Sequence, residues 1–80
     1  MKIDYEKIDD MTLALLNLVT YEDGYGCRAW KSFDWGTMNR LYEKGFITNP
    51  KGKAKSVIVT EEGLRRSQEL FKKFFELDEE

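Results

Sequence analysis

The sequence predicts one small α+β domain over residues 1–80, in the order helix, short turn, helix, β-hairpin and helix. Apolar residues recur at helical spacing near both ends of the chain. Between them, the order Asn49-Pro50-Lys51-Gly52 is typical of a type I turn, and the β-branched run 57–60 follows it. A chain of 80 residues with 41% hydrophobic residues is long enough for one core and too short for two.

The first helix is predicted at about residues 5–20 because apolar residues repeat there at helical spacing. The residues assigned to its core face are Ile8, Met11, Leu15, Leu18 and Val19, with Leu13 and Leu16 widening the stripe. Residues 21–26 contain two glycines and are predicted to form a loop. Residues 28–33 are expected to form a single helical turn at most.

A second helix is predicted to begin after Asp34, a residue that favours the N-cap, and to end before Gly45. The side chains expected on its buried side are Trp35, Met38, Leu41 and Tyr42. Those expected to face outward are Gly36, Thr37, Asn39, Arg40, Glu43 and Lys44. The aromatic residues Trp30, Phe33 and Trp35 are predicted to anchor the core, with a stacking platform or a partner contact as the alternative.

The third part is predicted as strand 46–48, a turn, and a return strand at about 53–60. Thr60 can cap a last helix over about residues 61–77. Its inward stripe is assigned to Leu64, Phe71, Phe74 and Phe75, which leaves Leu70 and Leu77 pointing away. Exposed apolar area of this kind predicts a homodimer with Leu70, Phe74 and Leu77 at its interface. The alternative is a broad core-facing stripe followed by a frayed acidic tail.

Two resemblances follow from these residues. The runs 41–47 and 57–63 are similar to the recognition helix and wing of winged helix-turn-helix domains, over about residues 34–75. The resemblance implies a winged-helix-like domain with a β-hairpin wing. Over nearly the whole chain, the runs 28–31, 33–35, 52–57 and 60–63 resemble a family of small bacterial proteins catalogued as a domain of unknown function. That resemblance implies no active site.

Charge is segregated along the chain, although the net charge is only −2. Residues 24–60 sum to +5, whereas the segments before and after them sum to −4 and −3. The basic segment coincides with the second helix and the hairpin, which predicts a DNA-binding or transcription-associated regulator that contacts duplex DNA. The predicted contact residues are Arg28, Lys31, Thr37, Asn39, Arg40, Lys44, Lys51, Lys53 and Lys55.

The alternative is a protein-interaction adaptor on the same scaffold without nucleic-acid binding. An isoelectric point of about 5.2 is low for a DNA-binding domain. Residues 21–33 also leave no room for the complete supporting helix of a helix-turn-helix motif. In addition, lysines at alternate positions in 51–55 are typical of an edge strand that avoids aggregation.

Several classes of protein are not expected. The chain has no histidine and one cysteine, Cys27, so neither a metal site nor a nucleophile–base pair is predicted. No phosphate-binding glycine motif occurs, and neither a cofactor nor enzyme activity is expected. The lone cysteine and the absence of an apolar leader favour a cytoplasmic location. The longest apolar run, 13–16, is far too short to span a membrane.

Overall fold

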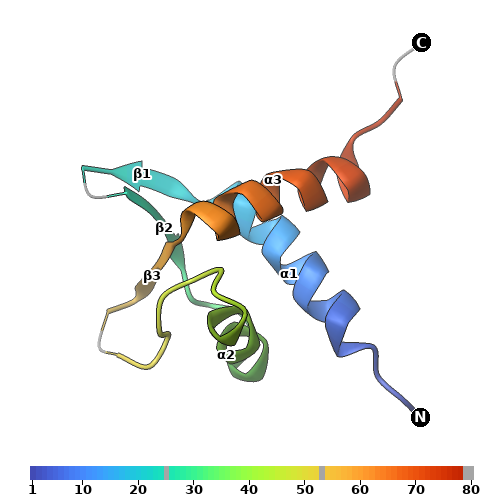
Figure 1. Ribbon diagram of the computed structural model, residues 1–80, viewed down its shortest axis with the longest axis horizontal. Coiled ribbons are helices and arrows are strands. Elements are labelled where there is room, and N and C mark those ends of the chain that lie inside the picture. Colours follow the sequence, from blue (N-terminus) through green and yellow to red (C-terminus); the bar gives the residue numbers. More distant parts are fainter. Residues whose placement is uncertain (25, 53, 79–80) are drawn as a thin grey trace.

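The computed structural model describes residues 1–24, 26–52 and 54–78. The described residues form α1 (Tyr5–Val19), β1 (Tyr21–Asp23), β2 (Gly26–Trp30), α2 (Trp35–Glu43), β3 (Ser56–Val59) and α3 (Glu61–Phe75) (Figure 1). The three strands make one antiparallel sheet in the order β1-β2-β3. This content confirms the predicted α+β class and is compatible with a small winged-helix-like fold.

The helix boundaries follow from capping residues. Each helix begins after a side chain whose oxygen accepts a hydrogen bond from the backbone N–H three residues further on. These caps are Asp4, Asp34 and Thr60. Gly45 ends α2 because its φ of +83° lies in the left-handed region that favours glycine, and its N–H donates to the carbonyl of Tyr42. The predicted caps at Asp34, Gly45 and Thr60 are confirmed.

The segment between the first two helices is a β-hairpin. Tyr21 pairs with Arg28, and Arg28 also pairs with Ile58 of β3. The predictions of a loop at 21–26 and a helical turn at 28–33 are therefore wrong. Hydrogen bonding to a strand far along the chain stabilises β2, and local sequence patterns carry no signal for such a partner.

The sheet also decides which aromatic residues are buried. Side chains alternate along a strand, so the burial of Ala29 turns the adjacent Trp30 outward, where it is 51% exposed. Trp35 begins α2 and is also exposed, because Met38 and Leu41 supply the inward face of that helix. The prediction that both tryptophans lie in the core is wrong.

The predicted first strand of the wing is reduced to one bridge, between Ile47 and Val59. The side chain of Asn49 bonds the backbone ahead of it, because its Oδ1 accepts from the N–H of Lys51 at 2.9 Å. The return strand starts at Ser56, later than expected. The wing is thus mostly a loop that joins Ile47 to β3.

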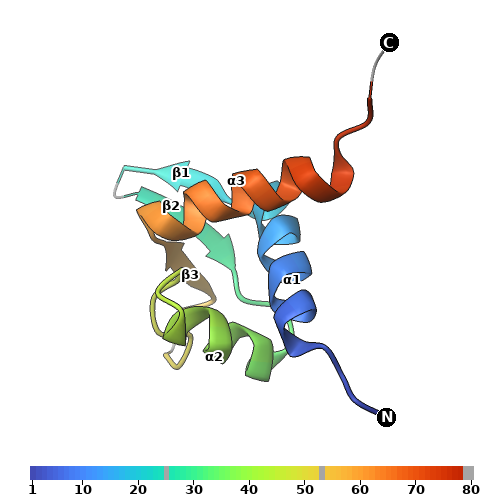
Figure 2. The same ribbon diagram turned by 45° about the vertical axis from the view of Figure 1, so that its right-hand side comes forward.

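The core lies among the three helices and the sheet, where α3 crosses the C-terminal part of α1 and α2 lies near the N-terminal part of α1 (Figures 1 and 2). Its buried apolar residues are Leu13, Ala14, Leu16, Ala29, Met38, Leu41, Ile47, Val57, Val59 and Leu70. Every element except β1 contributes at least one of them.

The last helix is rotated relative to the prediction. Its buried residues are Gly63, Ser67 and Leu70, and Phe74 packs partly buried against the core. Two small residues let the backbone of α3 approach its neighbours closely, and Leu70 shares their face. Leu70 is 1% exposed, so the prediction that it points away toward a dimer interface is wrong. Leu77 lies beyond the helix and is 84% exposed.

The first helix has its predicted extent, and Leu13 and Leu16 are buried as predicted, but most of the predicted core face points outward. Its buried residues are Asp9, Leu13, Ala14 and Leu16. Most of the stripe assigned to the core is exposed instead, namely Ile8, Leu15, Leu18 and Val19. Asp9, Leu13 and Leu16 share one side of the helix, and the polar partners of Asp9 on α2 hold that side inward.

Candidate functional site

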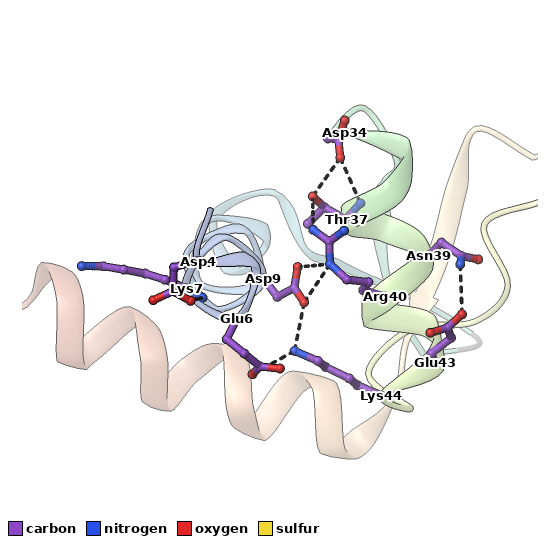
Figure 3. A network of polar contacts seen from close by, with 10 residues as sticks. All are labelled: Asp4, Glu6, Lys7, Asp9, Asp34, Thr37, Asn39, Arg40, Glu43 and Lys44. Atoms are coloured by element: carbon purple, nitrogen blue, oxygen red, sulfur yellow. Dashed lines mark hydrogen bonds and ion pairs between the residues drawn. The ribbon is translucent and has the colours of Figure 1, made fainter. Parts of the chain in front are cut away.

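Three of the side chains predicted to contact DNA, namely Thr37 and Arg40 of α2 and Lys44 just after it, lie in a polar network between α2 and α1 (Figure 3). Nε of Arg40 donates to both carboxylate oxygens of Asp9, at 2.8 and 3.1 Å. Nη2 of Arg40 donates to the hydroxyl of Thr37 at 3.0 Å, and its guanidinium lies 4.8 Å from the ring centroid of Tyr5. Arg40 therefore holds α2 against α1.

Lys44 completes this network. Its Nζ donates to Asp9 at 2.9 Å and to Glu6 at 3.3 Å. The Asp9 side chain is 2% exposed, whereas those of Lys44 and Arg40 are 28% and 30% exposed. Burial alone lowers the pKa of Lys44, but the hydrogen bonds and charges of Asp9 and Glu6 outweigh burial and raise the pKa overall. A buried carboxylate thus takes up both basic charges of α2.

The two other predicted contacts on α2 are also engaged. Thr37 is buried, and its hydroxyl donates to Asp34 at 3.0 Å. The backbone N–H and the hydroxyl of Thr37 hold the pKa of Asp34 below its usual value. Nδ2 of Asn39 donates to Glu43 at 3.1 Å on the exposed side of the helix. The expectation that Thr37 faces outward is wrong, because this face of α2 meets α1.

The predicted basic residues of β2 and its following loop have structural contacts. Nε of Arg28 donates to the hydroxyl of Ser56 on β3 at 3.0 Å. Nζ of Lys31 donates to the backbone carbonyls of Pro50 and Gly52, at 2.6 and 2.9 Å. Lys31 therefore fixes the loop that replaces the predicted wing.

Two predicted basic residues remain on the surface of that loop. Lys51 and Lys55 are exposed, and within the described ranges neither side chain forms an ion pair. Lys53 lies outside the described residues. The structure thus does not gather the predicted DNA-binding residues: Thr37, Arg40 and Lys44 face α1. Asn39, Arg28 and Lys31 have contacts elsewhere, and Lys51 and Lys55 are exposed on the loop.

The feature that the sequence prediction assigned to the core is an apolar surface on α1. We call Ile8, Met11, Leu15 and Leu18 the outer stripe. Three of these side chains are exposed, with Leu18 at 65%, and Met11 is half-buried. Their spacing of three, four and three residues gives the seam of a two-heptad coiled coil. The stripe lies on the side of α1 opposite Asp9, Leu13 and Leu16.

A groove of about 470 Å³ runs along the N-terminal part of the outer stripe. Its lining residues are Lys2, Ile3, Asp4, Lys7, Ile8, Met11, Thr12, Leu15 and Phe33. Phe33 packs partly buried against the core and forms the wall facing α1. The groove is mainly apolar and carries Lys2, Asp4 and Lys7 at one end, so it can accept an apolar segment of another molecule.

Three comparisons relate this chain to other proteins. The family model described as a domain of unknown function (DUF6429) matches residues 4–77. A curated relative, "Uncharacterized protein y4hR" of Sinorhizobium fredii (strain NBRC 101917 / NGR234), is 53% identical over 75 residues, which cover 94% of this chain and 97% of the relative. No solved structure matches the chain. These findings confirm the predicted resemblance to a bacterial family of unknown function.

The helices were also compared with the length and hydropathy that a membrane span requires. None of the helices in the described ranges is long and apolar enough to cross a bilayer.

Proposed function

The chain belongs to the DUF6429 family of unknown function, and we propose that it is a protein-interaction module that binds an apolar segment of a partner through the outer stripe. The observation that carries the proposal is an exposed coiled-coil seam on a helix whose other side is already buried in the core. A helix of this kind has a second apolar face that the described chain covers only in part.

The energetics of the outer stripe support binding. Burial of a large aliphatic side chain contributes roughly 1.5–3 kcal/mol when it is fully removed from water. Ile8, Leu15 and Leu18 retain between 38% and 65% of their exposure, so covering them still releases part of that energy. Contiguous exposed apolar area on a small protein marks an interaction surface.

The charges of α2 favour this function over DNA binding through a recognition helix. Phosphate binding that drew Arg40 or Lys44 away from Asp9 would leave a buried carboxylate with one cation fewer. An unpaired buried charge costs several kcal/mol, whereas a single exposed phosphate contact returns less. The network therefore supports a structural role for these cations.

Site-specific photocrosslinking tests the proposed function. A benzoylphenylalanine side chain at Thr12, which lines the groove, is expected to form an adduct with a partner protein in cells. The same group at Gln68, exposed on α3, is the matched control. Because Ile8→Asp places a charge in the outer stripe, it should lower the Thr12 adduct at least about fivefold.

The adduct partner is identified by mass spectrometry, and its adduct is re-formed with the purified protein. Circular dichroism verifies that the Ile8→Asp chain is folded. Equal adduct yields from Thr12 and Gln68, or an adduct unaffected by Ile8→Asp, would contradict the proposal.

A second candidate function is duplex DNA binding through the basic loop, favoured by the exposed Lys51 and Lys55. It predicts weak binding that falls steeply as salt is raised, because bound cations release counterions from DNA. Titration of labelled duplex DNA at two salt concentrations measures this, with the Lys51→Glu, Lys55→Glu double variant expected to abolish binding. The Lys72→Glu, Lys73→Glu variant, which changes exposed lysines on α3, is the charge-matched control. Absence of binding at low salt would eliminate this candidate.

A further inference from the structure

We propose that the partner segment is α1 of a second copy of this chain, packed antiparallel against the outer stripe. This inference rests on the proposed function, because it names the occupant of the same surface. It replaces the predicted dimer through the terminal helix. Leu70, one of the residues predicted at that interface, is buried within the chain and cannot contact a second copy.

The spacing of the outer stripe is self-complementary. The intervals of three, four and three residues read the same in both directions. When two such helices pair antiparallel around a two-fold axis, Ile8 lies opposite Leu18 of the second copy and Met11 lies opposite Leu15. Every apolar side chain of the stripe then meets another, so one surface patch serves as both halves of the interface.

Charge favours the antiparallel direction. Lys2, Asp4 and Lys7 line the N-terminal end of the groove and give it a net positive charge, so parallel pairing would bring two positive ends together. Antiparallel pairing separates them and brings Lys7 next to the C-terminal end of α1 in the second copy. The last turn of α1 contains no basic residue, so a lysine from the second copy would compensate the negative end of the helix dipole.

The available area is sufficient for a weak dimer. Residues beside the stripe that also retain exposed apolar surface are Ile3 and Val19. Together with the stripe they offer a small interface, at the lower end of the size range for a specific association. The expected dimer therefore dissociates on dilution through the micromolar range.

Sedimentation equilibrium of the full chain measures the association. We expect a monomer–dimer equilibrium that Leu18→Asp shifts toward monomer by at least about tenfold in the dissociation constant. Leu77→Asp changes a leucine of even greater exposure outside α1 and should leave the dimer intact. Because Leu18 and Leu77 are both largely exposed, both variants should fold, which circular dichroism verifies. Dissociation by Leu77→Asp alone would overturn the inference in favour of the terminal segment.

Disulfide trapping tests the direction of pairing in a Cys27→Ser background. A mixture of Ile8→Cys and Leu18→Cys chains should give a covalent dimer containing one of each, because these positions face each other. Ile8→Cys alone should give far less, since its two copies lie at opposite ends of the pair. Efficient self-linking of Ile8→Cys would show parallel pairing and overturn the inference.

The two proposals fail differently. A purified chain that stays monomeric throughout the micromolar range, while the Thr12 crosslink forms with another protein, refutes self-pairing and leaves the interaction module standing. Loss of every Thr12 adduct together with a monomeric chain refutes both.

Discussion

Gly63→Ala is expected to destabilise the protein by about 3 kcal/mol, because the new methyl group has no space. A Cβ atom at this position would lie 1.9 Å from the carbonyl oxygen of Phe46 and 2.8 Å from its carbonyl carbon. Both atoms belong to backbone that the fold holds in place, since the Phe46 carbonyl also accepts from the N–H of Thr60 at 3.0 Å. The start of α3 must therefore move away from the loop after α2, which disrupts the core between them.

Gly36→Ala is the matched control for this prediction. Gly36 also lies in the first turn of a helix, but its added Cβ would meet only side-chain atoms, at 3.4 and 3.6 Å. Alanine is preferred over glycine in a helix by about 1 kcal/mol, so Gly36→Ala should leave stability unchanged or raise it slightly. Urea unfolding followed by circular dichroism gives both free energies. A Gly63→Ala chain as stable as the wild type would contradict the close approach of α3 to Phe46.

Asp9→Ala is expected to lower the free energy of unfolding by about 2–3 kcal/mol, the range for lost hydrogen bonds to a charged group. The buried carboxylate accepts from Arg40 and Lys44, and its removal leaves two cations facing each other across the junction of α1 and α2. Because the pair of cations is partly exposed, water offsets some of their repulsion, which keeps the loss below that of a fully buried network.

Asp10→Ala is the control, because it removes an identical charge from the next position of α1 without touching the network. Its effect should stay within about 0.5 kcal/mol. Unfolding curves at increasing pH provide a second measure. The raised pKa of Lys44 stabilises the fold fully below the ordinary lysine value of 10.5, and this contribution is lost as pH rises through the folded-state pKa. Equal losses for Asp9→Ala and Asp10→Ala would show that the network contributes no stability.

Local chemistry allowed several features to be predicted from the sequence. The boundaries set by Asp34, Gly45 and Thr60 depend on hydrogen bonds to backbone within three or four residues, so the neighbouring sequence contains the whole signal. The same reasoning gave the bond from Asn49 to the backbone of Lys51. The hairpin of β1 and β2 could not be predicted in this way. β2 also pairs with β3, which follows α2 in the sequence, and no local pattern reports that pairing.

The candidate site was missed because periodicity identifies apolar faces without stating which one is buried. The first helix has two such faces, and the longer one was assigned to the core. Asp9 is not among the residues that the apolar pattern assigns to the core. Its burial against Arg40, 31 residues away, is a tertiary contact that no local pattern reports. An acidic residue sharing a helix side with Leu13 and Leu16 was the available signal.

The carboxylate at position 9 has a consequence for how such a protein can diverge. This carboxylate determines which of the two apolar faces of α1 is buried and which is exposed to a partner. A neutral substitution at position 9 would weaken the contact between α1 and α2. It would also remove the free-energy cost of exposing a buried carboxylate when α1 rotates to bury its other apolar face. We therefore expect related chains without an acidic residue at position 9 to present a different docking surface on the same fold.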